Sequence, residues 1–270
     1  MANERSEFLG TALRAALLAG DCILRNLGHI SRDDIDIKQA SDFVTRVDRE
    51  AEDLIINTIK KSFPDHKILA EETLREESKD HYRWIIDPLD GTTNYIHQYP
   101  MFSVSIALEY EGQIILGLVY DPLRNEIFTA EKNRGAFLNG RSISVSKATI
   151  MNECLIATGF PFKNKEHLDN YLILFKKIIT RVSDLRRAGS AALDLAHLAC
   201  GRLDGFFELG LKPWDIAAGS ILVQEAGGII TDFSGATDYL TTCNIVAAAP
   251  SIQIEILNEV RSVFSGIIDR

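Results

Sequence analysis

The chain has 270 residues, of which 46% are hydrophobic and 25% are charged, and its formal net charge at pH 7 is -9. A chain of this length and composition buries a substantial core, either as one large domain or as two closely packed halves. The acidic balance argues against a general nucleic-acid or anionic-membrane binder, leaves room for a local basic patch, and is compatible with cation binding.

Two amphipathic helices are predicted near the amino terminus. Apolar residues recur at helical spacing over residues 6–27, with Gly28 as the stop, and again over residues 43–62. Asp48, in the first turns of the second helix, reads locally as a solvated acid favoured by the helix dipole. The second helix is expected to turn its charges away from its buried residues, which are Val47, Ala51, Leu54, Ile55 and Ile59.

Two apolar strands then end in acidic residues. The run 67–70 precedes Glu71 and Glu72, and the run 84–86 precedes the turn 87–91 (Asp-Pro-Leu-Asp-Gly). Two carboxylates leave this one tight turn, since Pro presets φ and Gly accepts a positive φ. If the two strands are neighbours, their acids converge. If they are not, the pentapeptide is only a surface turn and the paired glutamates are solvated.

The residues after this turn favour the start of a helix. Residues 92–94 (Thr-Thr-Asn) are typical of a helix N-terminus, so backbone N–H groups and the positive helix end would face the space beside the carboxylates. Such an arrangement suits a cation and a phosphate together.

The rest of the amino-terminal half is predicted to be a largely antiparallel sheet. Three strand-like runs, 102–109, 113–120 and 125–130, form a meander. Asn139-Gly140 then marks a tight hairpin turn between two further short runs, 136–137 and 143–145.

The carboxyl-terminal half alternates strands with helices, which predicts a sheet covered on both faces. The predicted elements are a strand at 154–158, helices at 165–181 and 189–200, a strand at 205–209, and a helix from 214 to 228. No linker separates the halves. We place the boundary near 146–152 and expect two tightly packed halves that act as one unit, 1–148 with most of the metal ligands and 149–270 with the rest of the pocket.

The cysteines and the apolar segments indicate the compartment. No C-x-x-C pair is present, which argues against a zinc cluster and a disulfide framework. The amino terminus, MANERSEF, lacks the apolar core of a signal peptide, and no apolar run approaches the roughly 18 residues of a membrane span. We therefore expect a cytoplasmic protein, away from membranes, with four reduced cysteines, Cys22, Cys154, Cys200 and Cys243.

The acidic residues permit metal chemistry if they meet. At about 4 Å and an effective dielectric near 20, each like-charged pair repels by roughly 4 kcal/mol, so the acids either stay apart or enclose cations. Oxygen ligands without His or Cys favour Mg²⁺. Two ions bridged by Asp87 would hold phosphoryl oxygens, lower the pKa of a water and stabilise the leaving alkoxide. Thr92 would orient that water and Asp48 would accept its proton. The acids concerned are Glu71, Asp87, Asp90 and Asp215.

Four blocks of sequence carry a resemblance. They are 42–48 (DFVTRVD), 71–73 (Glu-Glu-Thr), 84–94 (WIIDPLDGTTN) and 213–228 (PWDIAAGSILVQEAGG). Together they resemble the inositol monophosphatase family, from end to end of the chain and in the right order. Two further runs, 159–163 (GFPFK) and 186–196 (RRAGSAALDLA), are similar to the bacterial SuhB type of that family.

The resemblance implies a fold and a set of site residues. The fold is the inositol monophosphatase-like sugar-phosphatase fold, an α/β (α+β) layered sandwich of alternating helices and sheets, usually dimeric. Two or three Mg²⁺ ions would be held by Glu71, Asp87, the Leu89 carbonyl, Asp90 and Asp215. Thr92 and Asp48 would activate water and Glu72 would support the metal shell.

Substrate contacts follow from the same resemblance. The amides of Gly91 and Thr92 would hold phosphate, next to Asp90 and Asp215. Three residues would line the sugar-alcohol pocket, with Glu208 accepting hydrogen bonds from ring hydroxyls; they are Arg186, Ala191 and Glu208. For Arg186 a surface or interface position is the alternative, because Arg187 adjoins it.

Two departures from the family pattern are visible. Ala70 stands where many relatives have Gly, and Lys212 stands where some animal members have His. The second lies at the rim of the pocket, so it affects fine substrate preference rather than the chemistry.

The expected function is hydrolysis of myo-inositol 1-phosphate or a similar polyol phosphate. Fructose 1,6-bisphosphate, a 3′-phosphonucleotide and histidinol phosphate remain alternative substrates. Enzymes that act on these esters share the metal motifs, and the loops around the pocket decide which ester is preferred. A binding role is the alternative from another class. SuhB-type proteins are associated with bacterial transcription complexes, which implies contact with RNA polymerase or its elongation factors near Arg186-Arg187 or Lys176-Lys177.

Overall fold

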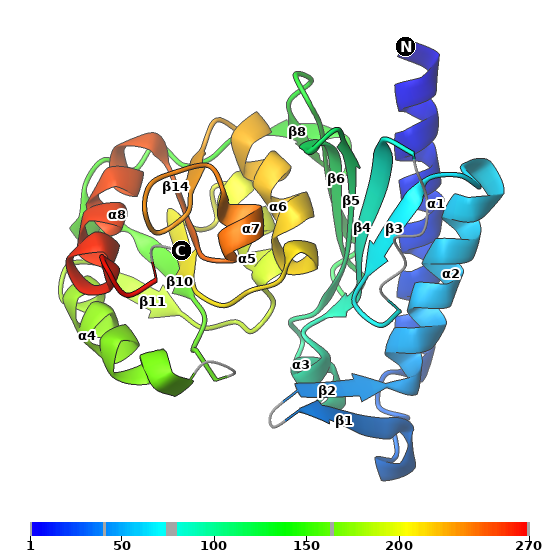
Figure 1. The fold of residues 1–270 in the computed structure, drawn as a ribbon, viewed down its shortest axis with the longest axis horizontal. Coiled ribbons are helices and arrows are strands. Elements are labelled where there is room, and N and C mark those ends of the chain that lie inside the picture. The colour runs from blue at the N-terminus through cyan, green and yellow to red at the C-terminus, as the bar shows by residue number, and fades with distance from the viewer. Residues whose placement is uncertain (1, 40–41, 74–79, 163–164, 269–270) are drawn as a thin grey trace.

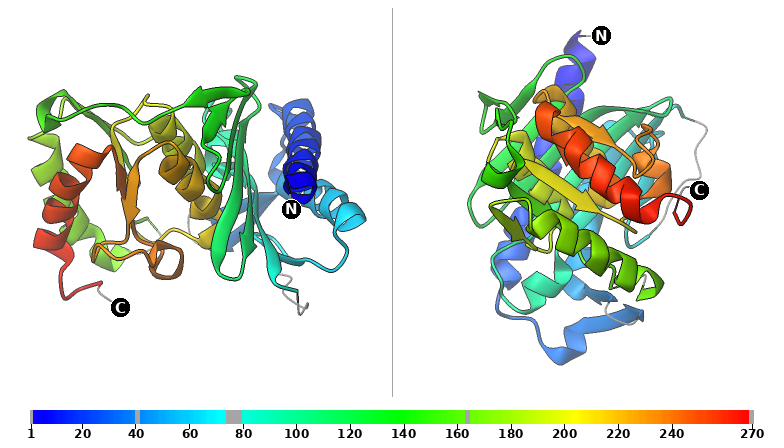
Figure 2. Two further views of the ribbon diagram at one scale, coloured as in Figure 1. Left: turned by 90° about the horizontal axis from the view of Figure 1, so that it is seen from above. Right: turned by 90° about the vertical axis from the view of Figure 1, so that its left-hand side faces the viewer.

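A computed structural model describes residues 2–39, 42–73, 80–162 and 165–268. Helices and sheets alternate in five layers (Figure 1), which confirms the predicted layered α/β architecture. Seen from above, the same layers stand side by side (Figure 2, left). Lys163, the last residue of the predicted GFPFK run, lies outside the described residues.

The first layer contains the two predicted amino-terminal helices, α1 (Ala2–Asn26) and α2 (Arg46–Ser62). The second begins three residues later than predicted, because β2 (Asp42–Thr45) pairs antiparallel with β1 (Ile35–Gln39). Thr45 then caps α2, since its hydroxyl oxygen accepts hydrogen bonds from the N–H groups of Val47 and Asp48. A short 3-10 turn, Arg32–Asp34, precedes β1.

The charge pattern predicted for α2 is wrong at two positions. Asp48 and Glu52 are both 1% exposed, and Leu54 is only half-buried while Ile56 is buried in its place. Residues four apart lie on the same face of a helix, so the two acids point together toward the loops at the end of the first sheet.

The second layer is a seven-stranded sheet with the order β3-β4-β5-β6-β7-β8-β9. β3 and β4 are parallel and the other neighbours are antiparallel, as the meander and hairpin patterns predict. The strands are β3 (Lys67–Ala70), β4 (Tyr82–Asp90), β5 (Ser103–Tyr110), β6 (Gln113–Asp121), β7 (Glu126–Glu131), β8 (Ala136–Leu138) and β9 (Arg141–Ile143). The short helix α3 (Thr92–Ile96) follows β4 where the Thr-Thr-Asn signal predicts a helix start.

A five-stranded mixed sheet with the order β11-β10-β12-β14-β13 forms the fourth layer. Its strands are β10 (Leu155–Thr158), β11 (Asp184–Arg186), β12 (Gly205–Glu208), β13 (Ile229–Thr231) and β14 (Ile245–Ala248). Sequence patterns predict only β10 and β12. The other three carry no sequence prediction, and β11 and β13, with three residues each, are too short to show an alternation.

Helices cover both faces of this sheet, as predicted. α5 (Ala191–Ala199) and α6 (Pro213–Glu225) lie between the two sheets, while α4 (Leu168–Ile179) and α8 (Pro250–Phe264) form the outer layer (Figures 1 and 2). The predicted helix at 165–181 divides into a 3-10 turn, Lys165–His167, and α4. Another 3-10 turn, Met151–Glu153, precedes β10, and α7 (Tyr239–Thr242) and α8 carry no sequence prediction.

Three apolar cores hold the layers together. Along β4, Trp84 and Ile86 face α1 and α2, whereas Ile85 between them faces α5 and α6. The central core continues through Leu195 and Ala217 into the second sheet, so the two sheets share one apolar interior. The division at residue 148 therefore stays a prediction. In the described part of the chain, no helix has the length and apolar character needed to cross a bilayer.

Candidate metal and phosphate site

The first pair of acids is delivered by two parallel strands. β3 and β4 run side by side with Ala70 opposite Ile86, and the Glu71 N–H donates to the Ile86 carbonyl at 3.2 Å. The next residues therefore lie side by side at the carboxyl end of β3, Glu71 just after that strand and Asp87 within β4. The two strands are neighbours, so the condition for the convergence of their acids is met.

The turn after Asp87 brings out the second carboxylate. The register with β5 shifts between Asp87 and Asp90, and the Leu89 N–H donates to Asp87 Oδ1 at 3.0 Å. Gly91 then adopts a φ of 97°, and a Cβ at this position would stand 2.8 Å from the Met101 carbonyl oxygen. Only glycine fits this close backbone approach at a positive φ.

Asp90 is held by the start of α5. Its Oδ2 atom accepts hydrogen bonds from the Ser190 hydroxyl at 2.6 Å and the Ala192 N–H at 2.8 Å. Ser190 is the N-cap of that helix, and its own oxygen accepts from the Leu193 N–H. The amino-terminal sheet is thereby connected to a helix about 100 residues away in the sequence.

Asp215 comes from the first turn of α6. Pro213 opens that helix, and the Lys212 N–H donates to Asp215 Oδ2 at 2.7 Å in a capping arrangement. The Ser105 hydroxyl donates to the Trp214 carbonyl at 3.1 Å, which fixes the start of the helix against β5. Asp215 is therefore placed by a helix end and a strand from opposite halves of the chain.

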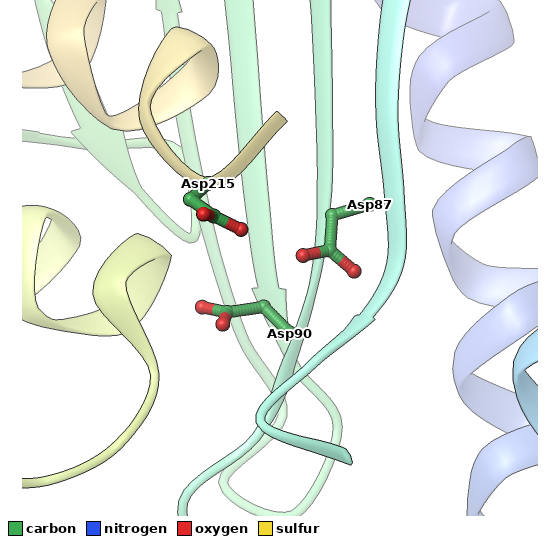
Figure 3. A group of neighbouring side chains, drawn as sticks. All are labelled: Asp87, Asp90 and Asp215. Atoms are coloured by element: carbon green, nitrogen blue, oxygen red, sulfur yellow. The ribbon is translucent and has the colours of Figure 1, made fainter. Parts of the chain in front are cut away.

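The three aspartates face one another (Figure 3). Carboxylate oxygens of Asp87, Asp90 and Asp215 all lie within 4.8 Å of one another. Asp87 is 2% exposed and Asp90 9%. Burial, and then the charges of Glu71, Asp90 and Asp215, raise the pKa of Asp87 well above its usual value. Burial, and then Asp90 and Glu71, do the same to the pKa of Asp215.

This donor set fits a hard cation. Burial raises the pKa of Asp90 to about 6 against the hydrogen bonds from Ser190 and Ala192 that lower it. Four acids whose charges destabilise one another in a buried space are stabilised when a divalent ion lies between them. Carboxylate oxygens at this spacing are ligands that Mg²⁺ accepts.

A second acid and a hydroxyl stand beside the aspartates. The Thr92 hydroxyl donates to Asp48 Oδ1 at 2.8 Å, with the Leu89 carbonyl 3.2 Å away. The other oxygen of Asp48 accepts from the N–H and hydroxyl of Thr45, at 2.9 and 2.5 Å. Burial raises the pKa of Asp48 to about 6, although the bonds from Thr45 and Thr92 act in the opposite direction.

A cavity of about 390 Å³ opens over these groups. Its walls contain nine of the residues singled out from the sequence: Glu71, Asp87, Leu89, Asp90, Gly91, Thr92, Ala191, Glu208 and Asp215. Asp48 lies beneath Thr92, to which it is hydrogen-bonded.

Besides Asp48, two residues singled out from the sequence do not line this cavity, Glu72 and Arg186. The Glu72 N–H donates to Glu52 Oε2 at 2.8 Å, so the backbone here is fixed from α2. Arg186 is exposed on β11, and its guanidinium pairs with Asp184. Its neighbour Arg187 lines the cavity instead, with the guanidinium over the rings of Phe160 and Phe162 at 5.8 and 5.6 Å.

Sequence reasoning missed several residues that shape the site. Asn94 Nδ2 donates to the carbonyls of Met101 and Ala188, which connects the turn after β4 to the loop before α5. Glu52 lies four residues after Asp48, and both are buried. This spacing places two residues on one helix face, so it could have indicated that the two acids are buried together. Gly159 and Arg187 carried no local signal, because their place in the cavity depends on strand neighbours.

Comparison with known proteins agrees with this geometry. The model of the inositol monophosphatase family matches residues 4–264. Nus factor SuhB of Escherichia coli is 47% identical over 263 residues, which are 97% of this chain and 98% of that protein. Nus factor SuhB of Vibrio cholerae is 47% identical over 94% of this chain and 95% of its own.

Solved structures show the same fold. The extragenic suppressor protein suhB from Bartonella henselae superimposes with a TM-score of 0.92 at 41% identity, over 94% of this chain and 98% of that chain. An inositol monophosphatase from Anabaena (Nostoc) gives a TM-score of 0.87 at 39% identity, over 96% and 97% of the two chains.

Proposed function

Because the chain belongs to the inositol monophosphatase family, we propose that it is a Mg²⁺-dependent phosphomonoesterase that hydrolyses myo-inositol 1-phosphate or a closely related polyol phosphate. The observation that carries this proposal is the group of three aspartates on the wall of one cavity, beside Glu71 and Thr92. Asp87 and Asp90 are buried and Asp215 is half-buried.

The metal ligands in this proposal are oxygen donors from both halves of the chain. Two or three Mg²⁺ ions would be held by Glu71, Asp87, the Leu89 carbonyl, Asp90 and Asp215. When bound, Mg²⁺ supplies charge neutralisation to the phosphate oxygens and makes water a better nucleophile.

Thr92 and Asp48 are proposed to handle the attacking water. The proton of the Thr92 hydroxyl is directed to Asp48, so its oxygen offers lone pairs to the cavity and accepts a hydrogen bond from water. That bond orients the water toward phosphorus, and Asp48 takes up the proton through the hydroxyl. The amides of Gly91 and Thr92, which line the same wall, are proposed to donate to phosphate oxygens.

The leaving group is proposed to lie against the wall formed by Ala191 and Glu208, with Glu208 accepting hydrogen bonds from ring hydroxyls. Arg186 is paired with Asp184 outside the cavity lining, so we assign the cationic contact on this side to Arg187. Glu72 keeps only an indirect role, through the backbone that Glu52 holds.

The test is phosphate release by the purified protein in Mg²⁺ and in EDTA. We expect kcat/KM for myo-inositol 1-phosphate to exceed the values for fructose 1,6-bisphosphate, histidinol phosphate and a 3′-phosphonucleotide, and to vanish in EDTA. Asp87→Asn should lower it at least ~100-fold. Absence of phosphate release from all four esters, together with an Asp87→Asn variant indistinguishable from wild type, would end the proposal.

A binding role in a bacterial transcription complex is the second candidate. It is favoured by the 47% identity to proteins named Nus factor SuhB. Lys177 is bonded to Glu259 and Ser262, and Arg186 is paired with Asp184. Arg187 lines the cavity, so the exposed Lys176 is the cation of these two pairs that we propose for contact with RNA polymerase or an elongation factor.

The two candidates are separable by one variant. Asp215→Asn should abolish phosphate release, so a cellular role that survives this substitution would belong to the binding function. If cells carrying Asp215→Asn behave as a deletion does, the phosphatase accounts for the role.

Two expectations from the sequence remain part of the proposal. A homodimer is supported by exposed apolar residues on α4, Leu172 and Ile173, and sedimentation at micromolar concentration tests it. The four cysteines are free, which is compatible with the proposed cytoplasmic location.

A further inference from the structure

A second pair of parallel strands ends at the cavity, opposite the pair that delivers Glu71 and Asp87. β10 and β12 are parallel with Thr158 opposite Phe207. The next residues therefore lie at the same end of the second sheet, Gly159 just after β10 and Glu208 at the end of β12, and both line the cavity.

Glu208 occupies the space that a side chain at position 159 would need. A Cβ atom added to Gly159 would overlap Cδ and both carboxylate oxygens of Glu208. Gly159 does not have a positive φ, so its backbone accepts any L-residue. The absence of a side chain is required here by the position of the Glu208 carboxylate and not by the conformation of the chain.

The end of β10 is closely packed. Thr158 and Tyr171 are buried, and their hydroxyls are hydrogen-bonded at 2.9 Å. Asp194 on α5 is 2% exposed, and burial followed by the charge of Glu208 raises the pKa of Asp194 well above its usual value. Movement of the Glu208 carboxylate toward Asp194 would bring two acids together, whereas the cavity that Glu208 lines offers open space.

We propose that Gly159 is a specificity-determining residue that positions Glu208. By leaving room for the carboxylate against the end of β10, it keeps Glu208 at the back wall of the cavity, where ring hydroxyls of a polyol phosphate reach it. This inference rests on the proposed function and adds to it the residue that sets the depth of the leaving-group pocket. Gly159 positions and does not itself react.

The test is Gly159→Ala, assayed with two esters. For myo-inositol 1-phosphate we expect KM to rise about tenfold with kcat within about twofold, because hydrogen bonds to a charged acceptor are lost and the metal ligands are untouched. For p-nitrophenyl phosphate, whose leaving group has no ring hydroxyls, the change in kcat/KM should stay within about twofold.

Matched variants isolate the cause. Gly10→Ala on α1 is the control for a glycine replacement, since a Cβ there meets only Arg14 Nη1 at 3.6 Å. In a Glu208→Ala background the overlap is gone, so adding Gly159→Ala should leave KM for myo-inositol 1-phosphate at the Glu208→Ala value. An additional rise of KM in the double variant would overturn the proposal.

A crystal structure of Gly159→Ala supplies a readout independent of activity. We expect the fold unchanged and the Glu208 carboxylate moved into the cavity; a carboxylate at its original place would overturn the inference. If the wild type hydrolyses neither ester, the proposed function fails, and the crystal structure still decides whether Gly159 positions Glu208. If the wild type is active and Gly159→Ala has the wild-type KM on both esters, only the inference fails.

Discussion

At the scale of single residues, the candidate site brings together carboxylates whose negative charges repel one another when no cation lies between them. Beyond the larger effect of burial, the charges of Asp90 and Asp215 raise the pKa of Asp87, and the charge of Asp90 raises the pKa of Asp215. Asp215 also accepts the Lys212 N–H at the start of α6, a hydrogen bond that an asparagine side chain reproduces. Removing its charge therefore relieves repulsion without removing the helix cap.

Asp215→Asn is expected to stabilise the metal-free protein and weaken its response to metal. Relief of one buried like-charge contact should raise the melting temperature in EDTA by about 2–4 °C, equivalent to about 1 kcal/mol. Added Mg²⁺ should raise the melting temperature of the wild type much more than that of the variant. Thermal unfolding in EDTA and across a Mg²⁺ titration measures both. Asp184→Asn, at an exposed ion pair, is the control, and a lower melting temperature for Asp215→Asn in EDTA would contradict the argument.

Thr92 offers a test of the water-orienting hydroxyl. Thr92→Val removes the bond to Asp48 while keeping the shape of the side chain, so we expect kcat to fall about 100-fold with little change in thermal stability. Thr92→Ser keeps the hydroxyl and should retain most of the activity. Activity that is retained in Thr92→Val and lost in Thr92→Ser would show that the methyl group, and not the hydroxyl, is what the reaction requires.

At the scale of elements, the position of α6 depends on how closely it approaches β6. A Cβ at Gly117 would stand 2.5 Å from both the Ala218 carbonyl oxygen and Ile221 Cγ2, so the helix backbone rests directly on the strand. Asp215 is three residues before Ala218 on the same helix. Displacement of the helix therefore moves a proposed metal ligand.

Gly117→Ala should reduce stability and metal response together. The clash is with backbone, which forces a shift of α6 or β6, and overpacking of this kind costs about 1–3 kcal/mol. Urea unfolding gives the loss of stability, and a Mg²⁺ titration followed by kcat gives the apparent metal affinity, which should weaken about tenfold. The control is Gly10→Ala on α1, where a Cβ has space. A variant that loses stability and keeps wild-type metal affinity would show that α6 moves without Asp215.

At the scale of the whole molecule, the cavity lies where the ends of two parallel strand pairs from different sheets face each other. β3 and β4 deliver Glu71 and Asp87 on one side, and β10 and β12 deliver Gly159 and Glu208 on the other. α5 and α6 begin between them and contribute Ser190 and Asp215. The shared central core fixes the distance between the two sides.

This convergence of acids predicts a pH dependence of stability in the absence of metal. Burial raises the pKa of Asp48 and of Asp90 to about 6, and raises the pKa of Asp87 and Asp215 well above the usual value. The folded protein therefore binds these protons more tightly than the unfolded chain, where aspartates titrate near ~3.9. The stability they contribute is full at low pH and lost as pH rises through about 6.

The measurement is the melting temperature in EDTA at pH 7.5 and at pH 5.5, for wild type and Asp215→Asn. The other titrating groups are common to both proteins, so the difference isolates the acidic cluster. On going from pH 7.5 to pH 5.5, we expect the melting temperature to change more favourably, toward higher stability, in the wild type than in Asp215→Asn. Saturating Mg²⁺ should remove that difference. A more favourable change in Asp215→Asn would contradict the predicted repulsion.

Much of the fold and part of the site were open to prediction because their signals are local. The 3.6-residue periodicity of α1 and α2, the meander of β5 to β7 and the turn at Asn139-Gly140 each reflect neighbours in the chain. β11 and β13 were missed because a strand of three residues shows no alternation. Asp48 and Glu52 were misjudged because their burial depends on partners that periodicity does not report.

The sequence by itself determined the order of the main elements, the family, and the placing of Asp87 and Asp90 in one turn, because each of these is written in adjacent residues. Only the tertiary structure decided that Asp215 meets them, that Arg187 rather than Arg186 lines the cavity, and that Glu208 lies over Gly159. These contacts join residues far apart in the chain, and the free energy that holds them comes from apolar packing between layers and not from local conformational preference.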